Sequence, residues 1–238
     1  MIYDQREFQL RFEWGTQGIE HLAPISDSVV IVDVLTFSTA VVVAAARGAT
    51  VFPYRWNDDS TVDYAKSVDA LLAGPRGESE HSLSPQSLTA LPKGSRIVLP
   101  SPNGATLSLA TGAAPTFAGC LRNACAVAEA ARERGPRVAV IACGEQWPNG
   151  DLRPSLEDHI GAGAVLTHLD GNPSPEAVAA IAVFETTKSH LPDTLRDCAS
   201  GKELIEWGFE DDIEIAARLN SDDVAPRLRD RAFVDDAA

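Results

Sequence analysis

Apolar and polar positions follow two alternating patterns along the chain. Phe8, Leu10, Phe12 and Trp14 stand at every second position, which predicts a half-buried strand. Residues 28–34 form a nearly continuous β-branched run, which is typical of a strand covered on both faces. Similar short apolar runs recur at residues 96–99, 115–119 and 137–142.

Helical stretches separate these runs. Ser38 and Thr39 open an Ala- and Val-rich helix that closes at Gly48, and Gly161 with Gly163 indicates close helix packing. Further helices are predicted over residues 123–134, 156–169, 175–191, 203–207 and 213–219, the last capped by Asp211 or Asp212. Residues 74–92 are predicted to be a long turn-rich loop, and the acidic end, 234–238, is expected to fray.

Short buried strands that alternate with helices imply an α/β fold with three layers, α/β/α, around a largely parallel or mixed sheet. We interpret residues 1–238 as one domain. Two related α/β halves, about 1–134 and 135–238, are a further hypothesis.

Composition narrows the class of partner and the compartment. The net charge of −14 excludes a nucleic-acid backbone as a partner, because phosphate binding there needs clustered Lys and Arg. The N-terminal residues lack a signal-peptide pattern, and Asp33 and several hydroxyl residues interrupt the most apolar stretch, which argues against a membrane segment. Four cysteines in 238 residues make no disulfide framework. We therefore expect a cytoplasmic protein.

Polar residues stand directly after the predicted strands, where ligands bind in open α/β sheets. Carboxylate, hydroxyl, amide and guanidinium groups there would suit Mg²⁺ and a phosphorylated ligand. The alternative is that the Ser, Thr and Asn residues only cap helices. Asp33 is harder to explain as a cap, because a carboxylate in an apolar strand needs a partner or a raised pKa. The residues at these positions are Asp33, Thr36, Ser38, Thr39, Ser101, Asn103, Gly104, Arg122, Asn123 and Glu145.

A second acidic pair, Glu157 and Asp158, opens the predicted helix over residues 156–169. Helical spacing places Asp158 on the apolar stripe with Ala162 and Val165, so it points toward the core. It is either a ligand or an acidic residue that favours the helix dipole. The spacings of cysteine phosphatases, aspartyl-phosphate enzymes, serine hydrolases and zinc sites are absent.

Several ordered motifs together resemble the 2-phosphosulfolactate phosphatase family over nearly the whole chain. They are Trp14-Gly15-x-x-Gly18, Val32-Asp33-Val34-Leu35-Thr36-Phe37-Ser38-Thr39, Pro102-Asn103-Gly104-Ala105, Leu121-Arg122-Asn123-Ala124, Gly144-Glu145, Leu156-Glu157-Asp158 with Gly161-x-Gly163, and Ser200-Gly201-x-Glu203-Leu204 followed by Asp211-Asp212. The resemblance implies a Mg²⁺-dependent hydrolase of 2-phospho-3-sulfolactate or a related phosphate ester of a 2-hydroxy acid. The family reaction belongs to coenzyme M biosynthesis.

On this resemblance, Asp33, Glu145 and Asp158 are the expected catalytic residues. Asp33 and an acidic partner, Asp158 first with Glu145 or Glu157 as alternatives, would hold the Mg²⁺ ion. The small anionic substrate would contact residues that offer N–H, hydroxyl, amide or guanidinium groups. These are Ser38, Thr39, Asn103, Gly104, Arg122, Asn123 and Arg153.

Two positions depart from the family pattern. Thr36 stands where the pattern has an arginine, and the 74–92 loop is shorter and altered. A hydroxyl does not replace a charge-assisted clamp. The alternative hypothesis is therefore a diverged protein that binds a phosphorylated or carboxylated metabolite without hydrolysing it. The sequence leaves the oligomeric state open between a monomer and a homodimer.

Overall fold

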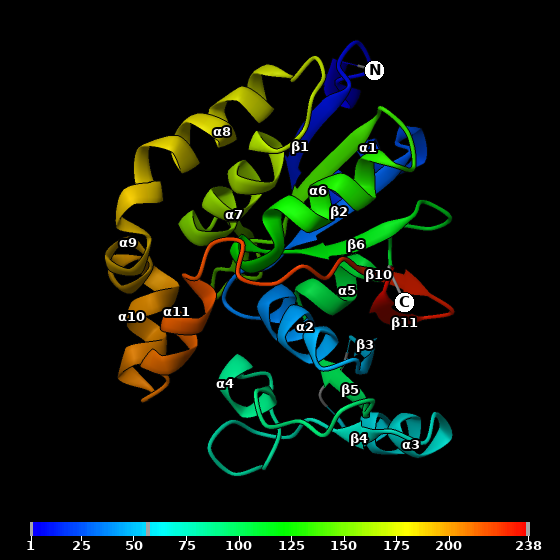
Figure 1. Ribbon diagram of the computed structural model, residues 1–238, viewed down its shortest axis with the longest axis vertical. Coiled ribbons are helices and arrows are strands. Elements are labelled where there is room, and N and C mark those ends of the chain that lie inside the picture. The colour runs from blue at the N-terminus through cyan, green and yellow to red at the C-terminus, as the bar shows by residue number, and fades with distance from the viewer. Residues whose placement is uncertain (1, 56–57, 237–238) are drawn as a thin grey trace.

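The computed structural model describes residues 2–55 and 58–236, and within them nine strands form one mixed sheet in the order β1-β7-β2-β6-β10-β11-β3-β5-β4 (Figure 1). The strands of this sheet are β1 (Leu10–Trp14), β2 (Ser28–Val32), β3 (Thr50–Tyr54), β4 (Leu71–Leu72), β5 (Arg96–Pro100), β6 (Thr116–Gly119), β7 (Val138–Ala142), β10 (Pro226–Arg229) and β11 (Ala232–Asp235). A separate antiparallel pair consists of β8 (Glu145–Gln146) and β9 (Leu152–Arg153).

The helices are α1 (Gly15–Leu22), α2 (Phe37–Ala46), α3 (Asp59–Ser67), α4 (Pro85–Leu88), α5 (Gly104–Ser108), α6 (Ala124–Arg132), α7 (Leu156–Thr167), α8 (Pro175–Thr187), α9 (Leu191–Asp197), α10 (Ala199–Glu206) and α11 (Glu210–Ala216). Short 3-10 turns are η1 (Ile2–Asp4), η2 (Ala23–Ile25), η3 (Leu121–Asn123) and η4 (Lys188–His190). None of the helices in the described part of the chain is long and apolar enough to cross a membrane.

The β-branched run at β2 is buried on both faces, as its pattern predicts. Val29 and Ile31 belong to a cluster with Ile19 and Leu22 of α1. The neighbouring residues Val30 and Val32 pack on the other face, against α6 and α7. The α/β prediction is thus confirmed, with helices on both sides of a mostly parallel sheet.

Parallel pairing within the sheet falls into two groups. One group contains β1, β7, β2 and β6, and the other contains β3, β5 and β4. The antiparallel hairpin β10–β11 joins them, because β10 pairs with β6 and β11 pairs with β3. Since β7 lies between β1 and β2, this sheet combines strands from residues 1–134 and 135–238.

The C-terminal prediction was wrong. Val234 and Asp235 belong to strand β11 instead of a frayed end, and the preceding Phe233 is fully buried. Ala237 and Ala238, which were also assigned to the fraying end, lie outside the described residues.

Several helix predictions are confirmed with shifted ends. α11 begins at Glu210, earlier than predicted, and Phe209 occupies the N-cap position without a side-chain cap. Asp211 and Asp212 lie in its first turn, so neither caps it. The predicted close packing at Gly163 is confirmed, because a Cβ there would lie 2.1 Å from the Ala180 carbonyl oxygen of α8.

Candidate active site

The carboxyl ends of β2 and β7 meet at one edge of the sheet. Val32 and Ala142, the last residues of these parallel strands, are register partners. Asp33 directly follows β2, and Glu145 lies just beyond β7. Glu157 and Asp158, in the first turn of α7, reach the same edge. The structure therefore brings together the four acidic residues predicted from three separate motifs.

Asp33 is buried and bridges two helix starts. Its Oδ1 accepts a hydrogen bond from the Phe37 N–H at 3.0 Å, and its Oδ2 accepts one from the Gly104 N–H at 3.0 Å. Burial, and then the negative charge of Glu145, raise the pKa of Asp33 to about 7, although both N–H donors act in the opposite direction. Asp33 thus fills the position at the starts of α2 and α5 where the sequence predicted a bound anion.

Gly104 is required by this close approach. A Cβ atom at this position would lie 2.2 Å from Cδ1 of Phe37 and 2.7 Å from Oδ2 of Asp33. The absence of a side chain therefore allows the start of α5 to contact both the ring and the carboxylate.

Asp158 ties together the loops that follow β2 and β7. Its Oδ1 accepts from the Val34 N–H at 2.7 Å. Its Oδ2 accepts from the Gly144 N–H and the Ser155 hydroxyl, each at 2.9 Å. Burial, and then the charge of Asp33, raise the pKa of Asp158 well above its ordinary value. With three donors in place, this carboxylate holds the backbone of both loops.

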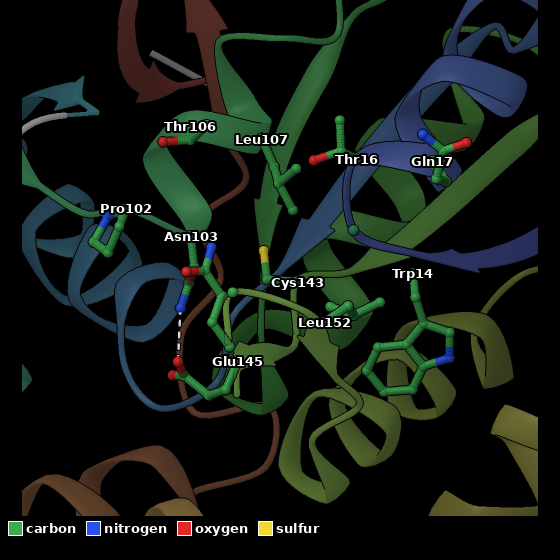
Figure 2. Close-up of a pocket in the computed structure, with 13 residues that line it drawn as sticks. Trp14, Thr16, Gln17, Pro102, Asn103, Thr106, Leu107, Cys143, Glu145 and Leu152 are labelled. Atoms are coloured by element: carbon green, nitrogen blue, oxygen red, sulfur yellow. Dashed lines mark hydrogen bonds between the residues drawn. The ribbon is translucent and has the colours of Figure 1, made fainter. Parts of the chain in front are cut away.

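Glu145 lies beside a hollow of about 260 Å³ (Figure 2). The Asn103 Nδ2 donates to its Oε2 at 2.9 Å, and both side chains line the hollow together with Trp14, Cys143 and Leu152. Burial raises the pKa of Glu145, whereas the hydrogen bond from Asn103 lowers it without reversing the direction. Glu145 is only partly buried, so it is accessible from this hollow.

These carboxylates repel one another. Beyond the effect of burial, Glu157 raises the pKa of Asp33, of Glu145 and of Asp158. A divalent cation would offset this repulsion, and Mg²⁺ typically binds one or two carboxylates together with water and phosphate oxygens. Across residues 2–55 and 58–236, no three Asp, Glu, His or Cys side chains form a group that could hold a metal ion. The donor set fits a Mg²⁺ ion that is bound by one or two carboxylates and whose coordination a substrate would complete.

Arg153 is the predicted cationic residue that lies near this group. Its positive charge lowers the pKa of Glu145 against the effect of burial. The guanidinium lies over the Trp147 ring at 5.8 Å, and its Nη2 donates to the Ser200 hydroxyl at 3.2 Å. Arg153 can therefore add positive charge beside Glu145.

Three other predicted substrate-binding residues bond to the backbone around them. The Ser38 hydroxyl donates to the Ile31 carbonyl and accepts from the Asp33 N–H, and the Thr39 hydroxyl donates to the Val34 carbonyl. Asn123 accepts from the Cys120 N–H and donates to the carbonyls of Ala118 and Val224. These contacts shape the loops after β2 and β6, but the capping alternative is wrong for α2 and α6, because Thr36 and Asn123 occupy the N-cap positions and neither side chain makes a cap hydrogen bond there.

Arg122 points to a different part of the molecule. Its Nη1 donates to the Ile215 carbonyl at 2.8 Å, and its Nη2 pairs with Asp222 at 2.6 Å. It lines a hollow that also includes Arg47 and Arg218, and this hollow is separate from the one beside Glu145.

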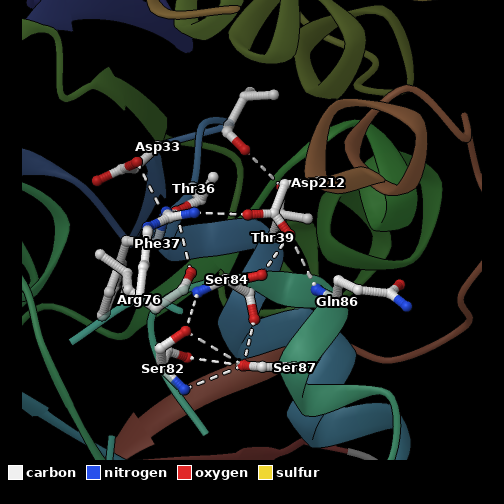
Figure 3. A network of polar contacts seen from close by, with 12 residues as sticks. Asp33, Thr36, Phe37, Thr39, Arg76, Ser82, Ser84, Gln86, Ser87 and Asp212 are labelled. Carbon is white, nitrogen blue, oxygen red and sulfur yellow. Dashed lines mark hydrogen bonds and ion pairs between the residues drawn. The ribbon is translucent and has the colours of Figure 1, made fainter. Parts of the chain in front are cut away.

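A polar network that the sequence did not predict surrounds Thr36 (Figure 3). Arg76, from the altered 74–92 loop, donates through Nη2 to the Thr36 hydroxyl and through Nη1 to Asp212 Oδ2. Asp212 is fully buried, and its Oδ1 also accepts from the Ser84 hydroxyl and the Gln86 N–H. The loop therefore places a guanidinium beside the residue that stands where the family pattern has an arginine. The sequence offers one indication of this contact, because Thr36 and the altered 74–92 loop both depart from the family pattern.

Comparison with known proteins agrees with the ordered motifs. The family model for 2-phosphosulpholactate phosphatase matches residues 16–231. Over 208 residues the chain is 34% identical to a probable 2-phosphosulfolactate phosphatase of Carboxydothermus hydrogenoformans, covering 84% of this chain and 85% of that protein. It is 31% identical over 205 residues to the 2-phosphosulfolactate phosphatase of Methanothermobacter thermautotrophicus, covering 84% and 86%. A probable 2-phosphosulfolactate phosphatase of Gloeobacter violaceus is 32% identical over 211 residues, covering 84% and 88%.

Proposed function

Because the chain belongs to the 2-phosphosulfolactate phosphatase family, a family of phosphoric monoester hydrolases, we propose that it releases phosphate from 2-phospho-3-sulfolactate or a related phosphate ester of a 2-hydroxy acid. The observation that carries the proposal is the convergence of Asp33, Glu145, Glu157 and Asp158 at one edge of the sheet, beside a hollow. A small anionic substrate can bind among these carboxylates only if positive charge accompanies it.

We assign Mg²⁺ to Asp33 and Glu157, which lie close enough for their charges to interact. When bound, the ion would polarise a phosphoryl oxygen and neutralise part of the phosphate charge. Asp158 is the first partner that the sequence predicts for Asp33, but its oxygens already accept three hydrogen bonds. We therefore propose that Asp158 positions the loops that carry Asp33 and Glu145.

Glu145 is the proposed acid that protonates the leaving oxygen of the ester. Its raised pKa keeps the proton on the carboxyl group at a higher pH than an ordinary glutamate would. Because the Asn103 amide donates to Oε2, the proton belongs on Oε1. The position of Glu145 beside the hollow gives a substrate access to this proton.

Two guanidinium groups are proposed to bind the anionic groups of the substrate. Arg153, whose charge acts on Glu145, would bind the phosphate. Arg76, held beside Thr36, would bind the second acidic group, a carboxylate or sulfonate. This assignment offsets the loss of charge at position 36 and favours an active enzyme over a protein that only binds its ligand.

The test is phosphate release from 2-phospho-3-sulfolactate with Mg²⁺, with EDTA, and in two variants. Asp33→Asn should lose at least about 100-fold in kcat, since it alters a proposed metal ligand and a pair of backbone contacts. The matched control is Asp63→Asn, which makes the same change on an exposed face of α3 and should keep full activity. Undiminished turnover by Asp33→Asn would remove this residue from the mechanism.

A thermal-shift screen distinguishes the alternative function. If intact phosphate esters stabilise the wild-type protein but no phosphate is released with Mg²⁺, the chain is a binding protein instead of a hydrolase. The observation that favours this alternative is Thr36, which removes one guanidinium from the family pattern.

A further inference from the structure

A second hollow lies at the opposite edge of the sheet from Asp33. Its volume is about 230 Å³, and its lining residues are Arg6, Arg11, Pro24, Ile25, Ser26 and Arg137. Arg11 is the second residue of β1, Arg137 directly precedes β7, and Ser26 lies just before β2. Since β1, β7 and β2 are parallel neighbours, these residues gather at the amino ends of the strands, and the proposed active site is at their carboxyl ends.

Arg11 is a buried guanidinium with neutral hydrogen-bond partners. The Arg11 residue is 1% exposed, and its Nη2 donates to the Ile25 carbonyl and the Ser26 hydroxyl, each at 3.1 Å. Its Nε is also buried and has no hydrogen-bond partner. Buried charged side chains are normally paired with an opposite charge, because leaving one unpaired is costly.

The nearest carboxylates are committed to other arginines. Asp27 binds Arg137 through both oxygens, with Nη2 at 2.6 Å from Oδ1 and Nε at 3.2 Å from Oδ2. Asp4 accepts from Nε of Arg6 at 3.3 Å. The hollow is thus lined by three guanidinium groups and flanked by two carboxylates, although the chain as a whole carries a charge of −14.

The charges around Arg11 also indicate that its guanidinium lacks a compensating negative charge. Burial, and then the positive charge of Arg137, lower the pKa of Arg11, whereas Asp27 and Asp4 raise it without restoring the ordinary value. A bound anion would offset both the cost of burying the Arg11 charge and the repulsion between the guanidinium groups of Arg11 and Arg137.

We propose that this hollow is a second anion site, which binds a small tetrahedral oxyanion such as inorganic phosphate or sulfate. Arg11 forms its inner wall, and the more exposed Arg6 and Arg137 complete its rim. Arginine suits this role because its planar donors form paired hydrogen bonds to phosphate-like oxygens. The volume is sufficient for such an ion with bound water, since one water takes about 30 Å³ of liquid. The site is separate from the proposed active site.

Calorimetric titration of the full chain with sodium sulfate at low ionic strength tests this proposal. Arg6 is 71% exposed, so Arg6→Gln should fold normally and weaken sulfate binding at least about threefold. Arg11→Gln should weaken it about tenfold or more, the effect of losing one charge-assisted contact. The matched control is Arg132→Gln, which removes an exposed arginine paired with Asp170 and should leave the affinity unchanged.

A parallel titration with phosphonoacetate distinguishes two sources of the ligand. Tighter Arg6-dependent binding of phosphonoacetate, an organic phosphonate, than of sulfate would show that the site prefers a phosphoryl group on an organic anion, and the reverse order would identify the free inorganic anion. The kcat/KM for phosphate release should stay within about twofold in Arg6→Gln and Arg11→Gln, because the two sites lie at opposite edges of the sheet.

The proposal is overturned if the wild-type protein binds no sulfate, or if Arg6→Gln and wild type bind it equally. Binding by the active site alone would give this second result. Arg6→Gln decides the matter even if Arg11→Gln fails to fold, because its side chain lies at the surface.

Discussion

Replacing Arg76 by glutamine tests whether the 74–92 loop is held by a buried charge. In the wild-type protein Arg76 Nη1 lies 2.5 Å from Asp212 Oδ2. The Asp212 side chain has no exposed surface, and the Arg76 side chain is 19% exposed. Arg76→Gln leaves Asp212 as a buried carboxylate with two remaining donors, the Ser84 hydroxyl and the Gln86 N–H.

The expected loss of stability follows from these contacts. Removing one partner of a buried ion pair costs about 3–5 kcal/mol. Arg76 is partly accessible and two donors stay on Asp212, so we expect the lower part of that range or slightly less, about 2–4 kcal/mol. For a chain of this length the midpoint of thermal unfolding should fall by about 5–15 °C.

Urea unfolding at pH 7 measures this loss. The double variant Arg76→Gln/Asp212→Asn removes both charges and should recover at least about half of the lost free energy, because no unpaired carboxylate is buried. Arg132→Gln breaks an exposed pair with Asp170 and should change the free energy of unfolding by less than about 0.5 kcal/mol.

Steady-state kinetics examine the second role proposed for Arg76. If its guanidinium binds the second acidic group of the substrate, Arg76→Gln should raise KM about tenfold or more at a temperature where the variant is folded. A stability loss below about 1 kcal/mol, or a double variant no more stable than Arg76→Gln, would refute the structural reasoning. An unchanged KM would refute the substrate contact alone.

Three further predictions concern other parts of the molecule. Gly104→Ala adds a methyl 2.2 Å from Cδ1 of Phe37 and should cost about 1–3 kcal/mol in urea unfolding and lower kcat; unfolding identical to wild type would contradict it. Glu145→Gln should lower kcat about 100- to 10,000-fold in the phosphate-release assay. The control Glu206→Gln makes the same change at an exposed position and should leave kcat unchanged. Equal kcat values in the two variants would exclude the acid role of Glu145. Burial alone would raise the pKa of Asp236, but hydrogen bonds from Arg229 and Arg134 and the charge of Arg227 hold it below its ordinary value. Its contribution to stability is therefore present above the ordinary pKa and is lost as pH falls through the lowered pKa. Asp236→Asn should lose about 1–3 kcal/mol at pH 7, and its difference from wild type should begin to shrink near the ordinary pKa of 3.8 and vanish only below the lowered pKa; a difference that does not depend on pH would contradict this assignment.

Asp33 illustrates how far the sequence could lead toward the site. A carboxylate at the end of an apolar strand predicts either a partner or a raised pKa, and the structure has both. The Phe37 N–H is a local partner, four positions along the chain. The Gly104 N–H belongs to another helix, and nothing in the local pattern of either segment predicts that they meet.

The C-terminal hairpin was missed for a related reason. Residues 226–229 and 232–235 are only four residues long, and the charged residues Arg227, Arg229, Asp230, Arg231, Asp235 and Asp236 stand within and around them, so the local pattern favours a polar end. Their stability as strands comes from pairing with β6 and β3, and from the burial of Phe233 between distant elements. Such pairing is non-local, and the sequence of the hairpin alone does not contain it.

The sequence by itself determined the alternation of strands and helices, the edge at which the polar residues gather, and the family. These follow from periodicity and from the order of motifs, both of which can be read along the chain. Only the tertiary structure decided that Asp158 holds two loops, that Arg122 binds the Ile215 carbonyl and Asp222, and that Arg76 lies beside Thr36. The physical reason is that a side chain's partners depend on packing between segments far apart in sequence, where one buried donor or charge determines which contacts can form.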